Sequence, residues 1–161
     1  MALRALLLTS AAVLLILIHR MSAADPSSCR AVWLFKMACS QPRAAVVEQV
    51  KAWSSRQCYD SEGEECSYQI VTEAPGYVEI KHTNLSSQKS TALNFTFKPP
   101  DVPSFCSMRG LSTTAPPGGS SPYCVLHNLV NGSGLTQEAG FREICNAAMC
   151  PSMDVTACGA A

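Results

Sequence analysis

Leu93-Asn94-Phe95-Thr96-Phe97-Lys98 is the stretch that decides the fold. Large apolar residues take every second position from Leu93 onward, and polar residues take the positions between them. A period of two predicts a β-strand with one face toward a core and the other toward solvent. Asn94 begins an Asn-x-Thr sequon, and the alternation places it on the solvent face, where a glycan must lie. Prolines from Pro99 onward end the strand.

Other runs with the composition of strands lie on both sides of this one. Upstream, Cys66–Thr72 and Tyr77–Thr83 flank the turn signal Pro75-Gly76 and predict a hairpin. Downstream, Phe105–Leu111 and Tyr123–Val130 predict two more strands. The residues between these two, from 112 to 122, are rich in Pro, Gly, Ser and Thr and are expected to form a loop. The connections between the expected strands are of hairpin length, which favours antiparallel neighbours in a sheet of about five strands.

Helical spacing dominates the first third of the mature chain. An apolar stripe predicts an amphipathic helix over Pro42–Ser54, with the proline in its first turn. Its members are Ala45, Val46, Val50 and Trp53. Apolar residues three and four apart predict a second helical piece over Ser28–Cys39. Helices followed by strands indicate an α+β fold, with N-terminal helices packed on an antiparallel sheet.

The first 24 residues are typical of a secretory signal peptide. A basic Arg4 precedes the apolar run Ala5–Ile18, and the small residues Ser22 and Ala24 suit a cleavage site before Asp25. The apolar run is shorter than the roughly 20 residues that span a bilayer. We therefore expect a secreted, extracellular protein that consists of one domain over residues 25–161, with no membrane span after cleavage.

Nine cysteines lie in the expected mature chain, and an oxidising compartment favours disulfides between them. They are Cys29, Cys39, Cys58, Cys66, Cys106, Cys124, Cys145, Cys150 and Cys158. Their spacing lacks the close pairs of a zinc site. Cys58–Cys66 is expected to close an acidic turn, and Cys106–Cys124 to join two neighbouring strands. Because nine is odd, one cysteine stays unpaired or links two chains into a dimer.

The net charge and the glycosylation motifs limit which kinds of partner are expected. Of 12 Lys and Arg residues, Arg4 and Arg20 leave with the signal peptide, so 10 basic residues face 12 acidic ones and the net charge is −2. The basic residues are scattered, which argues against nucleic acid and anionic membranes as partners. Three sequons, at Asn84, Asn94 and Asn131, are candidate glycosylation sites and agree with secretion.

No catalytic motif accompanies the two histidines of the mature chain, His82 and His127. Both are expected on strands, and neither lies beside a nucleophile motif, a zinc motif or a phosphate-binding loop. The acidic residues from Asp60 to Glu65 lack the spacing of a calcium loop and are expected to form a solvated turn. The sequence therefore predicts no enzyme activity, no catalytic residue, no metal and no cofactor.

The order of a helix followed by antiparallel strands, over Pro42–Val130, resembles the cystatin-like arrangement. The inhibitory Gln-x-Val-x-Gly loop and Pro-Trp pair of cystatins are absent, since Gln49-Val50-Lys51 lies on the expected helix and lacks the glycine. The opening from Trp33 to Trp53 also resembles small secreted cysteine-rich vertebrate proteins, and that resemblance implies no particular function.

These observations favour a secreted, non-enzymatic binding or interaction protein. Its partner is expected to be either another protein, held by the loops near Pro99–Pro103 and Pro116–Gly119, or a small apolar ligand between helix and sheet. Two alternatives stay open. One is a secreted enzyme that uses His82 or His127, and the other is a protease-inhibitor-like module of cystatin-like topology.

Overall fold

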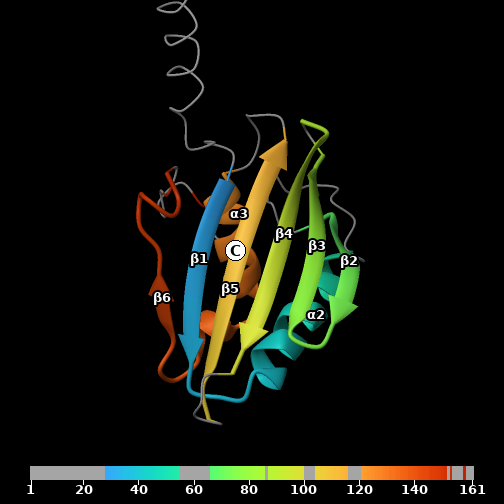
Figure 1. Ribbon diagram of the computed structural model, residues 1–161. Helices are drawn as coiled ribbons and strands as arrows, with labels where there is room; N and C mark the ends of the chain where they lie inside the picture. Colours follow the sequence, from blue (N-terminus) through green and yellow to red (C-terminus); the bar gives the residue numbers. More distant parts are fainter. Residues whose placement is uncertain are drawn as a thin grey trace, which may run out of the picture.

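The computed structural model describes residues 28–54, 66–85, 87–99, 104–115, 121–151, 153 and 158. The expected signal peptide, Cys58, and most of the two proline-containing loops (residues 100–103 and 116–120) lie outside these ranges. The described residues form a six-stranded sheet with two α-helices behind it (Figure 1). The elements are β1 (Ser28–Phe35), α2 (Ser40–Ser54), β2 (Tyr68–Ala74), β3 (Tyr77–Asn84), β4 (Lys89–Lys98), β5 (Cys106–Ala115), α3 (Pro122–Gly132), the 3-10 turn η1 (Leu135–Gln137) and β6 (Arg142–Ile144).

The strand order in the sheet is β2-β3-β4-β5-β1-β6, and every neighbouring pair is antiparallel. Strands β2 to β5 follow one another as hairpins, which confirms four of the five expected strands. Strand β1 then pairs with β5 along one edge, and the short β6 pairs with the other edge of β1. The α+β class and the antiparallel sheet are confirmed, with six strands rather than about five.

The alternation that predicted β4 is present in the structure. Leu93 and Phe95 are fully buried beneath the helices, whereas Asn94 and Thr96, at the alternate positions, are half-buried on the opposite face. Phe95 lies beside Gly110 of β5 in the register of the sheet, and its ring stacks with that of Trp33 on β1 at a centroid distance of 6.1 Å. One face of the sheet thus forms the core with the helices.

The helix expected over Pro42–Ser54 is confirmed as α2. Val46, Val50 and Trp53 are buried on its inner side, and it packs behind β2 at one end of the sheet (Figure 1). The side-chain amide of Gln49, in the orientation that satisfies both of its ends, donates to the carbonyl of Gly132 and accepts from Trp53 Nε1, each at 2.7 Å. The first of these hydrogen bonds joins α2 to the end of α3, and the second fixes the amide of Gln49 against Trp53 within α2.

The helix predicted over Ser28–Cys39 is wrong, because these residues form β1. The inner face of β1 carries every second residue, Cys29, Ala31, Trp33 and Phe35, all fully buried. Val32 and Leu34 on its other face are apolar as well, so the period of two is obscured in the sequence. Val32 and Leu34 are half-buried and lie opposite Ile144 and Arg142 of β6, so this face of β1 is not fully open to solvent.

The strand predicted over Tyr123–Val130 is also wrong, because these residues form most of α3. Eight of its eleven residues are buried, so the sequence shows a continuous apolar run in which helix and strand cannot be distinguished by period. Pro122 occupies its first turn, a position where the missing N–H of proline costs nothing. That proline is the sequence signal for the helix.

The loop expected over residues 112–122 is shorter than predicted, because β5 continues to Ala115. The hydroxyl groups of Ser112 and Thr114 are buried and hydrogen-bonded, whereas Thr113 is exposed and Ser121 Oγ is buried without a hydrogen-bond partner among the described residues. Ser112 Oγ donates to the carbonyl of Pro122 at 2.7 Å, and Thr114 and Thr91 share a hydrogen bond of 2.9 Å across the strands. A Ser/Thr-rich segment can therefore lie in a core when each hydroxyl finds a partner.

Three disulfides are described: Cys29–Cys150, Cys39–Cys106 and Cys124–Cys158. The predicted Cys106–Cys124 bond is wrong. Cys106 starts β5 and lies beside Phe35 at the end of β1, near Cys39, whereas Cys124 lies in α3 near the far end of β5. Cys66 is disulfide-bonded, but Cys58 lies outside the described residues, so the pairing of Cys58 with Cys66 stays a prediction.

Among the described residues, no helix combines the length and the apolar character that crossing a membrane requires.

Candidate functional site

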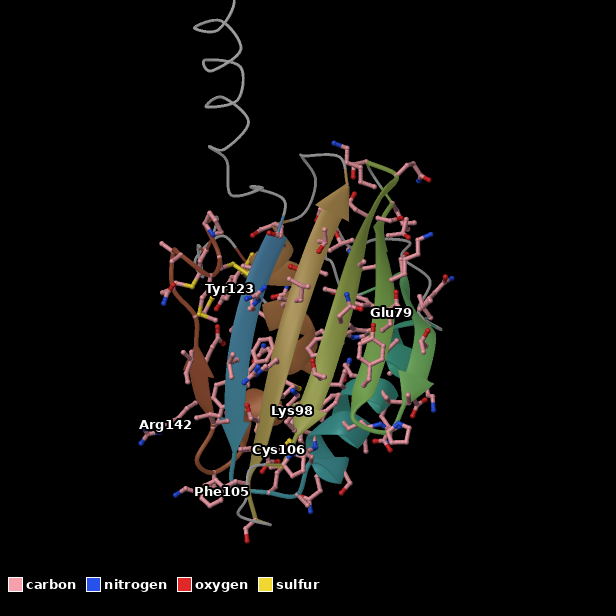
Figure 2. All side chains as sticks on the ribbon, viewed as in Figure 1. Glu79, Lys98, Phe105, Cys106, Tyr123 and Arg142 are labelled. Carbon is pink, nitrogen blue, oxygen red and sulfur yellow. A yellow bond between two sulfur atoms is a disulfide. The ribbon has the colours of Figure 1, made fainter. Side chains whose placement is uncertain are left out.

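An apolar groove opens where β1 ends and β5 begins. Its volume is about 590 Å³, and eight residues line it: Leu34, Phe35, Lys36, Phe105, Cys106, Ser107, Gly140 and Arg142. Figure 2 shows Phe105, Cys106 and Arg142 together at this end of the molecule. The volume falls within the range of roughly 300–1,000 Å³ that is usual for small-molecule sites.

Strand pairing places three of the lining residues on the sheet face that the helices leave open, while Phe35 and Cys106 contribute from the helix side. Leu34 of β1 lies opposite Ser107 of β5 and Arg142 of β6, and residues opposite one another in an antiparallel sheet share a face. The flanking residues Trp33 and Phe35 are fully buried on the helix side. Leu34, Ser107 and Arg142 therefore face away from the helices.

A glycine shapes one wall of the groove. The backbone of Gly140 has a φ of +82°, and a Cβ at this position would lie 2.7 Å from Cδ of Lys36. The aliphatic part of Lys36 thus lies directly on the glycine backbone. Only glycine combines this left-handed conformation with so close an approach. Phe105, which also lines the groove, leaves 39% of its surface exposed.

Two positive charges border this apolar surface. Lys36 and Arg142 are both exposed, and in the described part of the chain neither forms an ion pair or hydrogen bond through its side chain. Arg43 on α2, by contrast, pairs with Glu73. An uncompensated cation beside an apolar groove attracts an anionic group.

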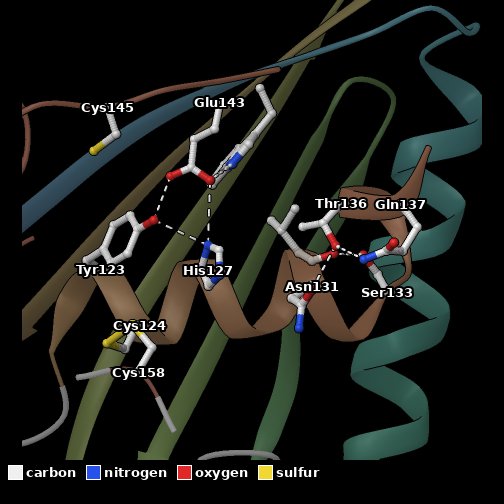
Figure 3. A network of polar contacts seen from close by, with 12 residues as sticks. Tyr123, Cys124, His127, Asn131, Ser133, Thr136, Gln137, Glu143, Cys145 and Cys158 are labelled. Carbon is white, nitrogen blue, oxygen red and sulfur yellow. Dashed lines mark hydrogen bonds and ion pairs between the residues drawn. A yellow bond between two sulfur atoms is a disulfide. The ribbon is translucent and has the colours of Figure 1, made fainter. Parts of the chain in front are cut away.

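A second cluster of functional groups lies on the helix side, around Glu143 of β6 (Figure 3). One carboxylate oxygen accepts from Tyr123 Oη at 2.8 Å, and the other accepts from Trp33 Nε1 at 3.0 Å. His127 Nδ1 lies 3.5 Å from the second oxygen and 3.3 Å from Tyr123 Oη. Tyr123 and His127 are four residues apart on α3, and their rings stack.

The donors around Glu143 control its ionisation. Burial works to raise the pKa of this carboxyl, but the hydrogen bonds from His127, Tyr123 and Trp33 outweigh burial and hold the pKa below its ordinary value of 4.5. Burial, followed by the hydrogen bond to Glu143, strongly raises the pKa of Tyr123. Glu143 is therefore an anion and Tyr123 a neutral donor at neutral pH.

The histidines do not converge. His82 is buried on β3, where its ring packs on that of Tyr68 with the two centroids 4.5 Å apart. His127 lies on α3 beside Glu143. Glu79, on the same strand as His82, faces the opposite side of the sheet, and Asp101 lies outside the described residues. Tyr123, His127 and Glu143 contribute nothing to the lining of the groove.

The three candidate glycosylation sites are all half-buried. Asn94 accepts a hydrogen bond of 2.7 Å from Tyr77 on the open sheet face. Asn84 ends β3 and accepts from the backbone N–H of Ser87 at 2.9 Å. Asn131, which lies in α3 rather than after a strand, accepts from Thr136 at 2.7 Å. None of the three lines the groove.

Sequence reasoning missed both the groove and the Glu143 cluster. Lys36 and Arg142 are far apart in the chain, and only the pairing of β1 with β6 brings their strands together. Tyr123 and His127 show helical spacing, which indicates a shared face once Pro122 is taken as a helix start. No local signal connects either of them to Glu143.

Comparison with known proteins gives no relative. No protein-family model, curated protein or solved structure matches the chain.

Proposed function

We propose that this is a secreted, non-enzymatic binding protein whose groove holds a small amphipathic anion. The observation that carries the proposal is the combination of an apolar groove, an exposed aromatic ring at Phe105, and the exposed cations Lys36 and Arg142, which pair with none of the described residues. An apolar chain would lie along Leu34 and Phe105. A carboxylate would bind Arg142, whose guanidinium offers two parallel donors.

The open face of the sheet suits such a ligand. Burial of an apolar chain supplies the larger share of the free energy, at about 25 cal/mol for each Å² removed from water. The two cations then select the sign of the charged group. In the proposed mature form the sequon at Asn94 carries a glycan on the same sheet face, over β4.

The enzyme alternative would rely on Tyr123, His127 and Glu143. Their arrangement resembles that of an acid–base pair with an orienting group. However, both carboxylate oxygens already accept from protein donors, and Trp33 and Tyr123 hold Glu143 at the interface of β1, α3 and β6. We assign this cluster to stability. The protease-inhibitor alternative rests only on the run of α2 and four antiparallel strands, since the inhibitory motifs are absent.

Titration of the purified secreted protein with decanoate tests the proposal. Isothermal titration calorimetry should give saturable binding of decanoate, and binding of decyltrimethylammonium, which has the same chain and the opposite charge, should be at least about tenfold weaker. Arg142→Gln should weaken decanoate binding about 5- to 20-fold, because a partly exposed charge-assisted hydrogen bond is lost.

Lys81→Gln is the matched control. Lys81 is exposed on the same sheet face, on β3, three strands from β1. Its replacement removes the same charge and should leave the affinity unchanged. Equal binding of the two surfactants, or equal weakening by the two substitutions, would disprove a built anion site in the groove.

A further inference from the structure

The unpaired cysteine of the described chain lies beside a disulfide. The sulfur atoms of Cys29, Cys145 and Cys150 are all within 4.8 Å of one another. Cys29 and Cys150 are bonded to each other, and Cys145 is a free thiol. Cys145 directly follows β6 and Cys29 is the second residue of β1, so the antiparallel pairing of these strands brings the two residues to the same end of the sheet.

Local hydrogen bonds hold the three residues in place. The N–H of Arg30 donates to the carbonyl of Met149 at 3.0 Å, which fixes the segment that carries Cys150 against β1. The thiol of Cys145 donates to the carbonyl of Arg30 at 3.5 Å. Cys29 and Cys150 are fully buried, whereas Cys145 is partly exposed. A reagent from solvent therefore reaches the thiol before it reaches the disulfide.

A metal site does not explain this cluster. Zinc and similar ions bind thiolates, and two of the three sulfur atoms are already consumed in a disulfide. Only Cys145 could supply a ligand while that bond exists. What the arrangement does provide is a nucleophile next to a bond that it can attack.

We propose that Cys29, Cys145 and Cys150 form an internal thiol–disulfide exchange site. The thiolate of Cys145 attacks one sulfur atom of the Cys29–Cys150 disulfide. A new bond forms from Cys145 to the attacked sulfur, the Cys29–Cys150 bond breaks, and the other sulfur leaves as a thiolate. The proton that Cys145 releases to solvent is taken up by the leaving thiolate. The number of disulfides does not change, so no oxidant or reductant is required.

The two products tether the C-terminal segment differently. Attack on Cys150 joins Cys145 to Cys150 within one turn and frees Cys29, which releases the segment after β6 from the start of β1. Attack on Cys29 joins β1 to the end of β6 and frees Cys150. In both products the free thiol moves to a residue that is buried in the starting structure, so exchange changes which cysteine can link to another molecule.

The surroundings of Cys145 slow this reaction at neutral pH. Burial, followed by the negative charge of Glu143, raises the pKa of the thiol, and a backbone hydrogen bond at Asn146 acts in the opposite direction. Mildly alkaline solution increases the thiolate fraction and should therefore speed up the exchange.

Alkylation followed by peptide mapping tests the proposal on the intact folded protein. A short pulse of N-ethylmaleimide at pH 6.5 should label Cys145. After incubation at pH 8.5 without added thiol, a second sample that receives the same pulse should carry label on Cys29 or Cys150, together with a new disulfide at Cys145. Digestion in acid prevents further exchange before mass spectrometry.

The other disulfides supply the internal control. Label on Cys29 and Cys150 together should exceed label on Cys39, Cys106, Cys124 and Cys158 by at least about tenfold, because local exchange leaves those bonds intact. Cys145→Ser should abolish label on Cys29 and Cys150. The proposal is overturned if label stays on Cys145 alone after prolonged incubation, or if all disulfides become labelled at one rate.

Discussion

At the scale of single residues, Glu143 links three elements around α3. Its carboxylate joins β1 through Trp33 and α3 through Tyr123 and His127, while its backbone belongs to β6. Each oxygen accepts at least one hydrogen bond inside the protein. Removal of the carboxylate leaves donors in the interior without an acceptor, and such groups lose their water without compensation.

We expect Glu143→Ala to lower the free energy of unfolding by about 2–3 kcal/mol, because Trp33 and Tyr123 lose a charged acceptor. Urea denaturation followed by tryptophan fluorescence measures the change. Glu48→Ala, at an exposed position of α2, should cost less than about 0.5 kcal/mol. Similar losses in the two variants would show that the network around Glu143 does not stabilise the fold.

The pKa of Glu143 also predicts how stability depends on pH. Because the folded-state pKa lies below the ordinary value of 4.5, the unfolded chain binds the proton more readily than the folded one. The contribution of Glu143 is therefore complete above pH 4.5 and is lost as the pH falls through the folded-state value. The wild type should lose more stability on acidification through this range than Glu143→Gln does, as measured by urea denaturation at each pH. Parallel curves for the two proteins would refute this.

At the scale of elements, the contact between β5, β1 and α3 depends on a missing side chain. A Cβ at Gly110 would lie 2.6 Å from Cζ3 of Trp33 and 3.0 Å from Cδ2 of Leu126. The tryptophan ring fills the space above this glycine, between the sheet and the helix. The sheet can approach α3 this closely only because Gly110 adds no atom there.

Gly110→Ala should therefore destabilise the protein by about 1–3 kcal/mol, since an added methyl group forces a large ring out of its position. Thermal or urea unfolding gives the value. Thr113→Ala, at an exposed outward position of the same strand, is the control and should cost under about 1 kcal/mol. A neutral Gly110→Ala would mean that Trp33 is not packed against β5 as described.

The elements that the sequence predicts correctly are those with one buried face. Helix α2 and strand β4 bury one side and expose the other, so their periods are visible in the sequence. Strand β1 and helix α3 are apolar on more than one side, and the period that distinguishes strand from helix is hidden there. Strand β6 has only three residues, which is too short for any pattern.

At the scale of the whole molecule, disulfides connect segments that are far apart in the chain. Cys29–Cys150 joins residues 121 positions apart, and Cys39–Cys106 joins residues 67 positions apart. Each bond that closes a long loop restricts the unfolded chain and so stabilises the fold by roughly 2–4 kcal/mol in the entropic model. The sequence indicates that such bonds form, but their pairing depends on the topology of the sheet.

Peptide mapping of the secreted protein under non-reducing conditions should find Cys29–Cys150, Cys39–Cys106 and Cys124–Cys158 together with the predicted Cys58–Cys66, and a thiol at Cys145. The sample should be alkylated at low pH before digestion, which preserves the starting pairing. Detection of Cys106 bonded to Cys124 would contradict the placement of α3 behind the sheet.

The groove shows why a binding site is harder to predict than a fold. Its lining comes from β1, the start of β5 and the segment before β6, and each segment contributes residues that are ordinary on their own. Phe105 and Arg142 come to line one groove only because β1, which carries Leu34, pairs with both β5 and β6. The sequence predicts a binding protein for either another protein or a small apolar ligand between helix and sheet, and we propose instead an amphipathic anion at the end of the sheet.

Chemical-shift mapping tests the central claim most directly. Decanoate is added to ¹⁵N-labelled protein, and the backbone amide signals are followed as the ligand concentration rises. The account predicts saturable shifts centred on Lys36, Phe105, Ser107, Gly140 and Arg142, and in Arg142→Gln the shifts of the other four should all need about 5- to 20-fold more decanoate to saturate. Shifts centred instead on Tyr123, His127 and Glu143, or no saturable shift at all, would contradict it.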